Sequence, residues 1–89
     1  MRRLVGPVPE PGERACSALR RCARASLSLG VGRPSTVSLA HHVPDTADVW
    51  LAVPMADTEA ITRGGVAARL EVLDVIPGGV AEGRCRRVV

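Results

Sequence analysis

The chain has 89 residues, enough for one small domain, and twelve arginines against nine acidic residues give it a net charge of +3. One tryptophan and no phenylalanine or tyrosine mean that the core must be aliphatic. This modest charge, with no basic cluster beside aromatic or amide readers, disfavours a nucleic-acid binder, and no apolar stretch has the length of a signal peptide or membrane span.

The first part of the chain divides into an arm and a helix. Residues 1–10 are punctuated by prolines, which push the preceding residues out of the helical region, so we expect an extended arm before the domain, either mobile or laid on a surface. Beyond it, Ala15, Leu19 and Cys22 recur at helical spacing with arginines on the other side. This pattern predicts an amphipathic helix over residues 11–25.

Three segments of alternating apolar and polar residues follow, at 26–31, 36–43 and 49–53. Each predicts a strand with one solvated face, and the short turn-forming stretches between them favour an antiparallel meander. Asp57 is then expected to cap a brief helix over residues 58–63, which the following glycines end.

The last third is expected to be a hairpin. From Val66 to Ile76 the alternation places Leu70 on an apolar face and Arg69 on the opposite one. The Pro77-Gly78 pair suits a type II turn, after which the chain is expected to return over residues 84–89. The order of elements predicts an α+β fold, with a small antiparallel β-sheet, an N-terminal helix and a short helix before the last hairpin.

His41 is expected on the apolar face of its strand with Val37 and Leu39, whereas the adjacent His42 faces the other way. That position makes His41 the one candidate for an axial haem ligand or a buried base. A hydrogen-bonded core or edge histidine is the alternative, because a lone histidine without a second ligand is a weak metal signal.

Arg84, Arg86 and Arg87 are the candidates for binding an anionic group, since guanidinium groups fit phosphate and carboxylate. The alternative is a solvated basic strand edge that discourages aggregation. Asp74 interrupts an apolar face and is expected to accept turn N–H bonds or to pair with one of these arginines. Trp50 would indicate a stacking surface if exposed and a core residue if buried.

Three stretches resemble a known family. Residues 68–77, followed by Val80 and the arginines at 84, 86 and 87, resemble the final strand pair of bacterial domains related to haem-iron utilisation proteins and pyridoxamine 5'-phosphate oxidase-like, FMN-binding split barrels. Residues 11–24 resemble the opening helix of those domains, and residues 50–57, which end in Pro-Met-Ala-Asp, resemble their strand that ends in a Pro-Ala-Asp segment. The resemblance implies an antiparallel, partial split barrel over residues 11–89, incomplete at its C-terminus, often dimeric and associated with flavin or haem.

These observations predict a non-catalytic or cofactor-binding module linked to haem or iron utilisation, with FMN or haem as ligand and Arg84, Arg86, Arg87 and His41 as cofactor-binding residues. If the chain is an enzyme, the resemblance implies a flavin-dependent oxidoreductase. The alternative is a small structural or interaction protein, or a degenerate fragment that has lost the site. Three cysteines without metal-ligand spacing predict reduced thiols in a cytoplasmic protein, and the resemblance implies a bacterial one. We expect a homo-oligomer, with no metal, nucleic-acid or membrane partner.

Overall fold

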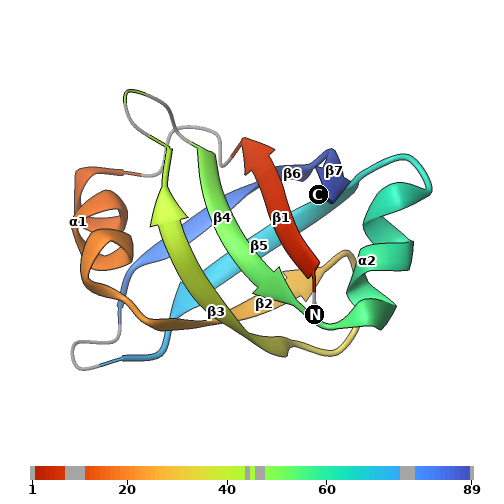
Figure 1. Ribbon diagram of the computed structural model, residues 1–89. Helices are drawn as coiled ribbons and strands as arrows, with labels where there is room; N and C mark the ends of the chain where they lie inside the picture. Colours follow the sequence, from red (N-terminus) through yellow and green to blue (C-terminus); the bar gives the residue numbers. More distant parts are fainter. Residues whose placement is uncertain (1, 8–11, 44, 46–47, 75–77, 89) are drawn as a thin grey trace.

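The computed structural model describes residues 2–7, 12–43, 45, 48–74 and 78–88. It shows an α+β fold in which an antiparallel sheet curls into a partial barrel, with one helix near the N-terminus and a second before the last hairpin (Figure 1). The predicted fold class is therefore confirmed.

Seven strands form the sheet in the order β6-β5-β2-β3-β4-β1-β7, and every described pair is antiparallel. The strands are β1 (Arg2–Pro7), β2 (Arg24–Leu29), β3 (Ser35–His42), β4 (Asp48–Val53), β5 (Val66–Val72), β6 (Val80–Cys85) and β7 (Arg87–Val88). The two ends of this order, β6 and β7, are separated along the chain by Arg86 alone. The sheet therefore curls round until its two sides nearly meet.

Strand β1 belongs to the sheet, whereas the sequence predicted an arm outside the domain for residues 1–10. The segment is extended as expected, but it pairs with β4 along its whole length and with β7 through Leu4 and Val5. Proline is compatible with this pairing because Pro7, which has no N–H to donate, is the last residue of the strand.

The two helices lie at opposite ends of the barrel (Figure 1). Helix α1 (Glu13–Arg21) is shorter than the predicted range, and its buried Ala15 and Leu19 face the sheet. It packs closely against Gly79, where a Cβ atom would overlap the methyl group of Ala18. Glycine at this position therefore allows the helix to lie directly on the start of β6.

Helix α2 (Met55–Thr62) begins earlier than predicted, with Pro54 rather than Asp57 at its N-cap. Asp57 lies in the first turn, where a negative charge suits the helix dipole. Thr58 and Ile61 are the buried residues of the helix, and they cover the end of the barrel near β1 and β7.

The core is aliphatic, as the composition requires. Its largest fully buried side chains are Leu19, Leu27, Leu51, Ile61, Val37, Val49 and Val53. In β5, Leu70 and Val72 are buried while Arg69 and Glu71 are exposed, so the predicted faces of this strand are confirmed.

The returning strand β6 begins at Val80, four residues before the predicted start. Gly78 has a positive φ of 138°, while the rest of the predicted turn, residues 75–77, lies outside the described residues. Neither described helix has the length and apolar character needed to cross a bilayer.

Candidate functional site

His41 lies on the outer face of the sheet, so its predicted place on the apolar face is wrong. The β3–β4 ladder shifts register between Leu39, which pairs with Leu51, and His41, which pairs with Trp50. An extra residue in one strand breaks the alternation of faces, and Ala40 and His41 are both exposed. The bulge therefore moves His41 from the core side to the solvent side.

Beside it, Trp50 occupies an outward position in β4, between the buried Val49 and Leu51. The His41 and Trp50 rings have centroids 5.7 Å apart and planes tilted by 35°. The sole aromatic residue of the Phe, Tyr and Trp class is therefore half-exposed outside the core. We call this pair the His41–Trp50 platform.

The register places one predicted arginine in line with the platform. His41 pairs with Trp50, Trp50 with Val5, and Val5 with Arg87, so these four positions form one lateral row across β3, β4, β1 and β7. Neighbouring strands are about 4.8 Å apart, which puts the Arg87 backbone about 14 Å from that of His41 along the sheet. Two of the four predicted cofactor-binding residues thus share one row.

Arg84 and Arg86 are not part of that row. Arg84 is exposed on β6, in register with Ala67, and its Nη2 donates to the carbonyl oxygens of Gly64 and Gly65, each at 3.4 Å. Arg86 is exposed between β6 and β7. The structure therefore does not gather the three arginines and His41 into one site.

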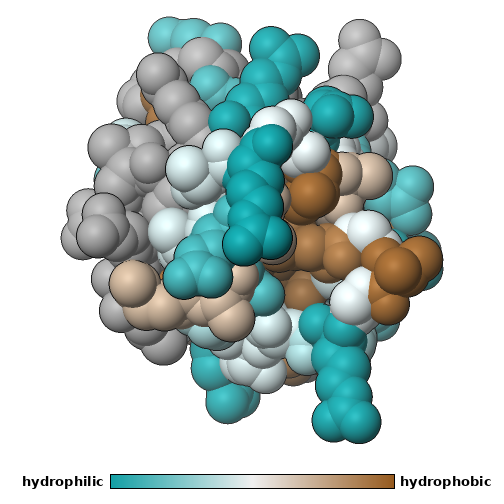
Figure 2. All heavy atoms as spheres, turned by 90° about the vertical axis from the view of Figure 1, so that its right-hand side faces the viewer, coloured by the Kyte–Doolittle hydropathy of each residue, from teal (hydrophilic) through white to brown (hydrophobic). Residues whose placement is uncertain are grey.

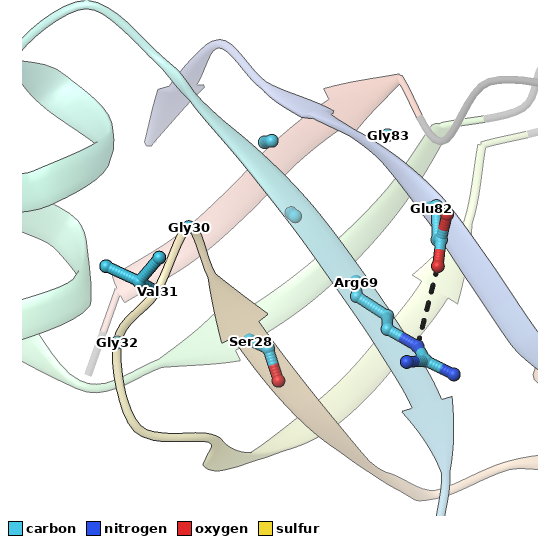
Figure 3. Close-up of a pocket in the computed structure, with 9 residues that line it drawn as sticks. Ser28, Gly30, Val31, Gly32, Arg69, Glu82 and Gly83 are labelled. Atoms are coloured by element: carbon cyan, nitrogen blue, oxygen red, sulfur yellow. Dashed lines mark ion pairs between the residues drawn. The ribbon is translucent and has the colours of Figure 1, made fainter.

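A second concave surface was not predicted from the sequence. An open depression of about 510 Å³ lies over β2, β5, β6 and the β2–β3 turn (Figure 3). It is lined by Ser28, Gly30, Val31, Gly32, Ala67, Ala68, Arg69, Glu82 and Gly83. The one sequence signal for it was the Gly-Val-Gly turn, in which Gly30 has a φ of +57° and projects Val31 into solvent.

The charged residues of this depression are Arg69 and Glu82, directly opposite each other on β5 and β6. Arg69 Nε lies 3.5 Å from a carboxylate oxygen of Glu82, and their side chains are 56% and 71% exposed. An ion pair so exposed contributes little to stability, so both groups are available to a ligand at small cost.

Large apolar side chains are also exposed to solvent. Val31 is fully exposed, at 108%, and Met55 is 54% exposed at the start of α2. Seen from the end of the molecule that carries α2, an apolar patch lies among hydrophilic side chains (Figure 2). This end of the barrel thus presents both apolar and charged groups.

Asp74 has the structural role that the sequence favoured, with different partners. Its carboxylate accepts hydrogen bonds from the backbone N–H groups of Ala23 and Arg24 and from Arg24 Nε at 3.4 Å. These contacts, the Ala23 N–H first, lower the pKa of Asp74 below its usual value. The carboxylate ties the end of β5 to the junction between α1 and β2.

The three cysteines form no disulfide; Cys22 and Cys85 are buried and Cys16 is half-buried. Burial raises the pKa of Cys22, and it raises that of Cys85 to about 11. Within the described ranges, no three His, Cys, Asp or Glu side chains gather where they could hold a metal ion.

Comparison with known proteins identifies no family for the chain. No protein-family model, curated protein or solved structure matches the chain.

Proposed function

We propose that this chain is a non-catalytic binding module of split-barrel-like form that takes a planar, anionic cofactor, a flavin or a haem, on the His41–Trp50 platform. The observation that carries the proposal is the position of Trp50. A small chain without phenylalanine or tyrosine would gain most by burying its one tryptophan, yet that ring stands on the outer face. A half-exposed ring beside a second exposed ring offers a stacking surface.

The row of residues through the platform suits both cofactors. A ring system stacked on Trp50 has His41 at one side for haem iron, and the row ends at the β7 position of Arg87, a residue type that pairs with phosphate or propionate. The resemblance of residues 68–77 to haem-utilisation and FMN-binding domains supports the same two ligands.

Intrinsic fluorescence with thermal unfolding tests the proposal, because the signal comes from Trp50 alone. The protein is titrated with FMN and, separately, with haemin. We expect saturable quenching with one of them and a raised unfolding midpoint, equivalent to about 2.7 kcal/mol at a hundredfold excess over Kd. Trp50→Leu should abolish the rise in midpoint while leaving the unfolding transition cooperative.

Haem ligation is tested separately by His41→Ala. We expect the variant to lose the Soret shift that haemin shows with the unaltered protein, whereas the neighbouring His42→Ala keeps it. An unchanged spectrum in His41→Ala removes His41 as a ligand. A cooperative transition that neither FMN nor haemin moves contradicts the cofactor proposal and favours the alternative, a small interaction protein.

We also propose that the module acts in the bacterial cytoplasm as a homodimer linked to haem or iron utilisation. Three cysteines that form no disulfide suit a reducing compartment, and a small aliphatic core gains stability from a partner copy. Size-exclusion chromatography with light scattering tests the dimer.

A further inference from the structure

The depression over β2, β5 and β6 shares no residue with the His41–Trp50 platform, and its two ends differ in chemistry (Figure 3). At one end Val31 and Ala67 present methyl groups beside the Gly30 backbone, whose N–H is bonded to the Ala67 carbonyl at 2.9 Å. At the other end stand Arg69 and Glu82. Ala67 and Arg69 are two positions apart on one strand, about 6.7 Å, so the apolar and polar ends are a few carbon atoms apart.

The polar end has unused donors. Arg69 contacts Glu82 through Nε, and among the described residues its two terminal nitrogens have no hydrogen-bond partner. Ser28 pairs with Arg69 across the β2–β5 ladder, so its hydroxyl stands on the same face as the guanidinium (Figure 3). The terminal edge of a guanidinium fits the two oxygens of a carboxylate, and the Ser28 hydroxyl adds a third donor.

We propose that this depression binds a carboxylate that carries a short apolar group. The carboxylate pairs with the terminal nitrogens of Arg69 and with Ser28, while the apolar group covers Val31 and Ala67. The fully exposed Val31 side chain gains from such cover because burial removes its apolar surface from water.

Glu82 selects a carboxylate over a phosphate. Its negative charge lies beside the same guanidinium, 3.5 Å from Nε, so it repels a second anion and repels a doubly charged phosphate more strongly. The site therefore favours a planar, singly charged anion. Two sources present this chemistry: a free short-chain carboxylic acid, and the C-terminal carboxylate of a peptide that ends in an apolar residue.

The test is titration of the full chain with hexanoate, followed by NMR chemical-shift changes. We expect saturable changes at Ser28, Val31 and Arg69, and none with hexanamide, which has the same tail without the charge. Phosphate should bind at least tenfold more weakly than hexanoate. In Val31→Ser, the preference for hexanoate over acetate should disappear.

Two variants that each remove one charge are expected to change the affinity for hexanoate in opposite directions. Arg69→Gln should weaken hexanoate binding at least tenfold, whereas Glu82→Gln should strengthen it by removing the competing carboxylate. Glu13→Gln removes an exposed glutamate on α1, outside the depression, and should leave the affinity unchanged. Circular dichroism confirms that each variant is folded.

Titration with acetyl-Gly-Leu, which has a free C-terminal carboxylate, distinguishes a peptide C-terminus from a free short-chain acid as the ligand. Tighter binding than hexanoate assigns the site to a peptide C-terminus, and weaker binding assigns it to a free acid. Equal binding of hexanoate and hexanamide overturns the proposal, as does an affinity for hexanoate that Arg69→Gln leaves unchanged.

Discussion

The Asp74 carboxylate accepts a hydrogen bond of 2.7 Å from the backbone N–H of Arg24, a residue 50 positions earlier in the chain. The same carboxylate oxygen accepts from the neighbouring N–H of Ala23, and the Arg24 side chain approaches the other oxygen. One side chain thus satisfies two donors that α1 and β2 leave at their junction.

Replacing Asp74 by asparagine should destabilise the fold at neutral pH and flatten its response to acid. The folded pKa is lowered, so the stabilising contribution is complete above the unfolded value of about 3.9 and is lost as the pH falls through the folded pKa. The measurement is the unfolding midpoint of the unaltered protein and of Asp74→Asn between pH 2 and pH 7. The two midpoints should differ at neutral pH and converge at acid pH, where the Asp74 carboxylate is protonated in both the folded and the unfolded state.

Asp45→Asn provides the matched control for that series. Asp45 is exposed and has a φ of 59°, a region that asparagine also tolerates. Its unfolding curve should follow that of the unaltered protein at each pH, and a loss equal to that of Asp74→Asn would contradict a specific role for Asp74.

Gly79→Ala should lower the free energy of unfolding by about 1–3 kcal/mol, because the new methyl group would overlap Ala18 and approach Val72 Cγ2 at 3.1 Å. Adding Ala18→Gly removes the overlapping methyl group at a helix cost of about 1 kcal/mol. Denaturant unfolding of the two single variants and the double variant should show that their losses are less than additive. Additive losses would mean that the helix does not rest on Gly79.

Leu19→Ala should cost about 2–5 kcal/mol, since it leaves a cavity where α1 meets the sheet. Val31→Ala should stay within about 0.5 kcal/mol, because the Val31 side chain is fully exposed. Urea unfolding measures both. Similar losses in the two variants would contradict the packing of α1 described above.

The three thiols should react with a disulfide reagent at different rates. The thiolate is the reactive form, and with a pKa of about 11 only about one Cys85 thiol in a thousand is ionised at pH 8. We expect Cys16 to react first, Cys22 more slowly and Cys85 only as the protein unfolds. A fast phase that persists in Cys16→Ser would show that a buried cysteine is more accessible than its position indicates.

Alternation along the chain predicted the faces of β5 because that strand is regular and each residue switches sides. The same reasoning failed at His41, since a single extra residue at the Leu39/His41 bulge reverses every position after it. No local pattern marks such an insertion, so the half of the platform that depends on His41 could not be placed from the sequence. For Trp50 the sequence left two interpretations open, a stacking surface and a core residue. The register of β4 decides between them.

The strand β1 and the depression were also beyond prediction. Residues 2–7 become a strand because β4 and β7 offer hydrogen bonds on both sides, and those partners come from distant parts of the chain. The depression joins Val31 from a turn with Arg69 and Glu82 from two later strands. Only tertiary pairing brings these residues together, whereas the helices and the order of elements follow from local spacing.

The pairing of β1 with β7 has a consequence for the order in which the molecule forms. Leu4 and Val88 come from opposite ends of the sequence, so their ladder closes the widest loop of any pair of strands in the sheet. The entropy lost on closing a loop grows with its length, which makes this seam one of the last contacts to form. With two registered pairs among the described residues, it should also be among the first to open, and its amide hydrogens should exchange before those of β2 and β3.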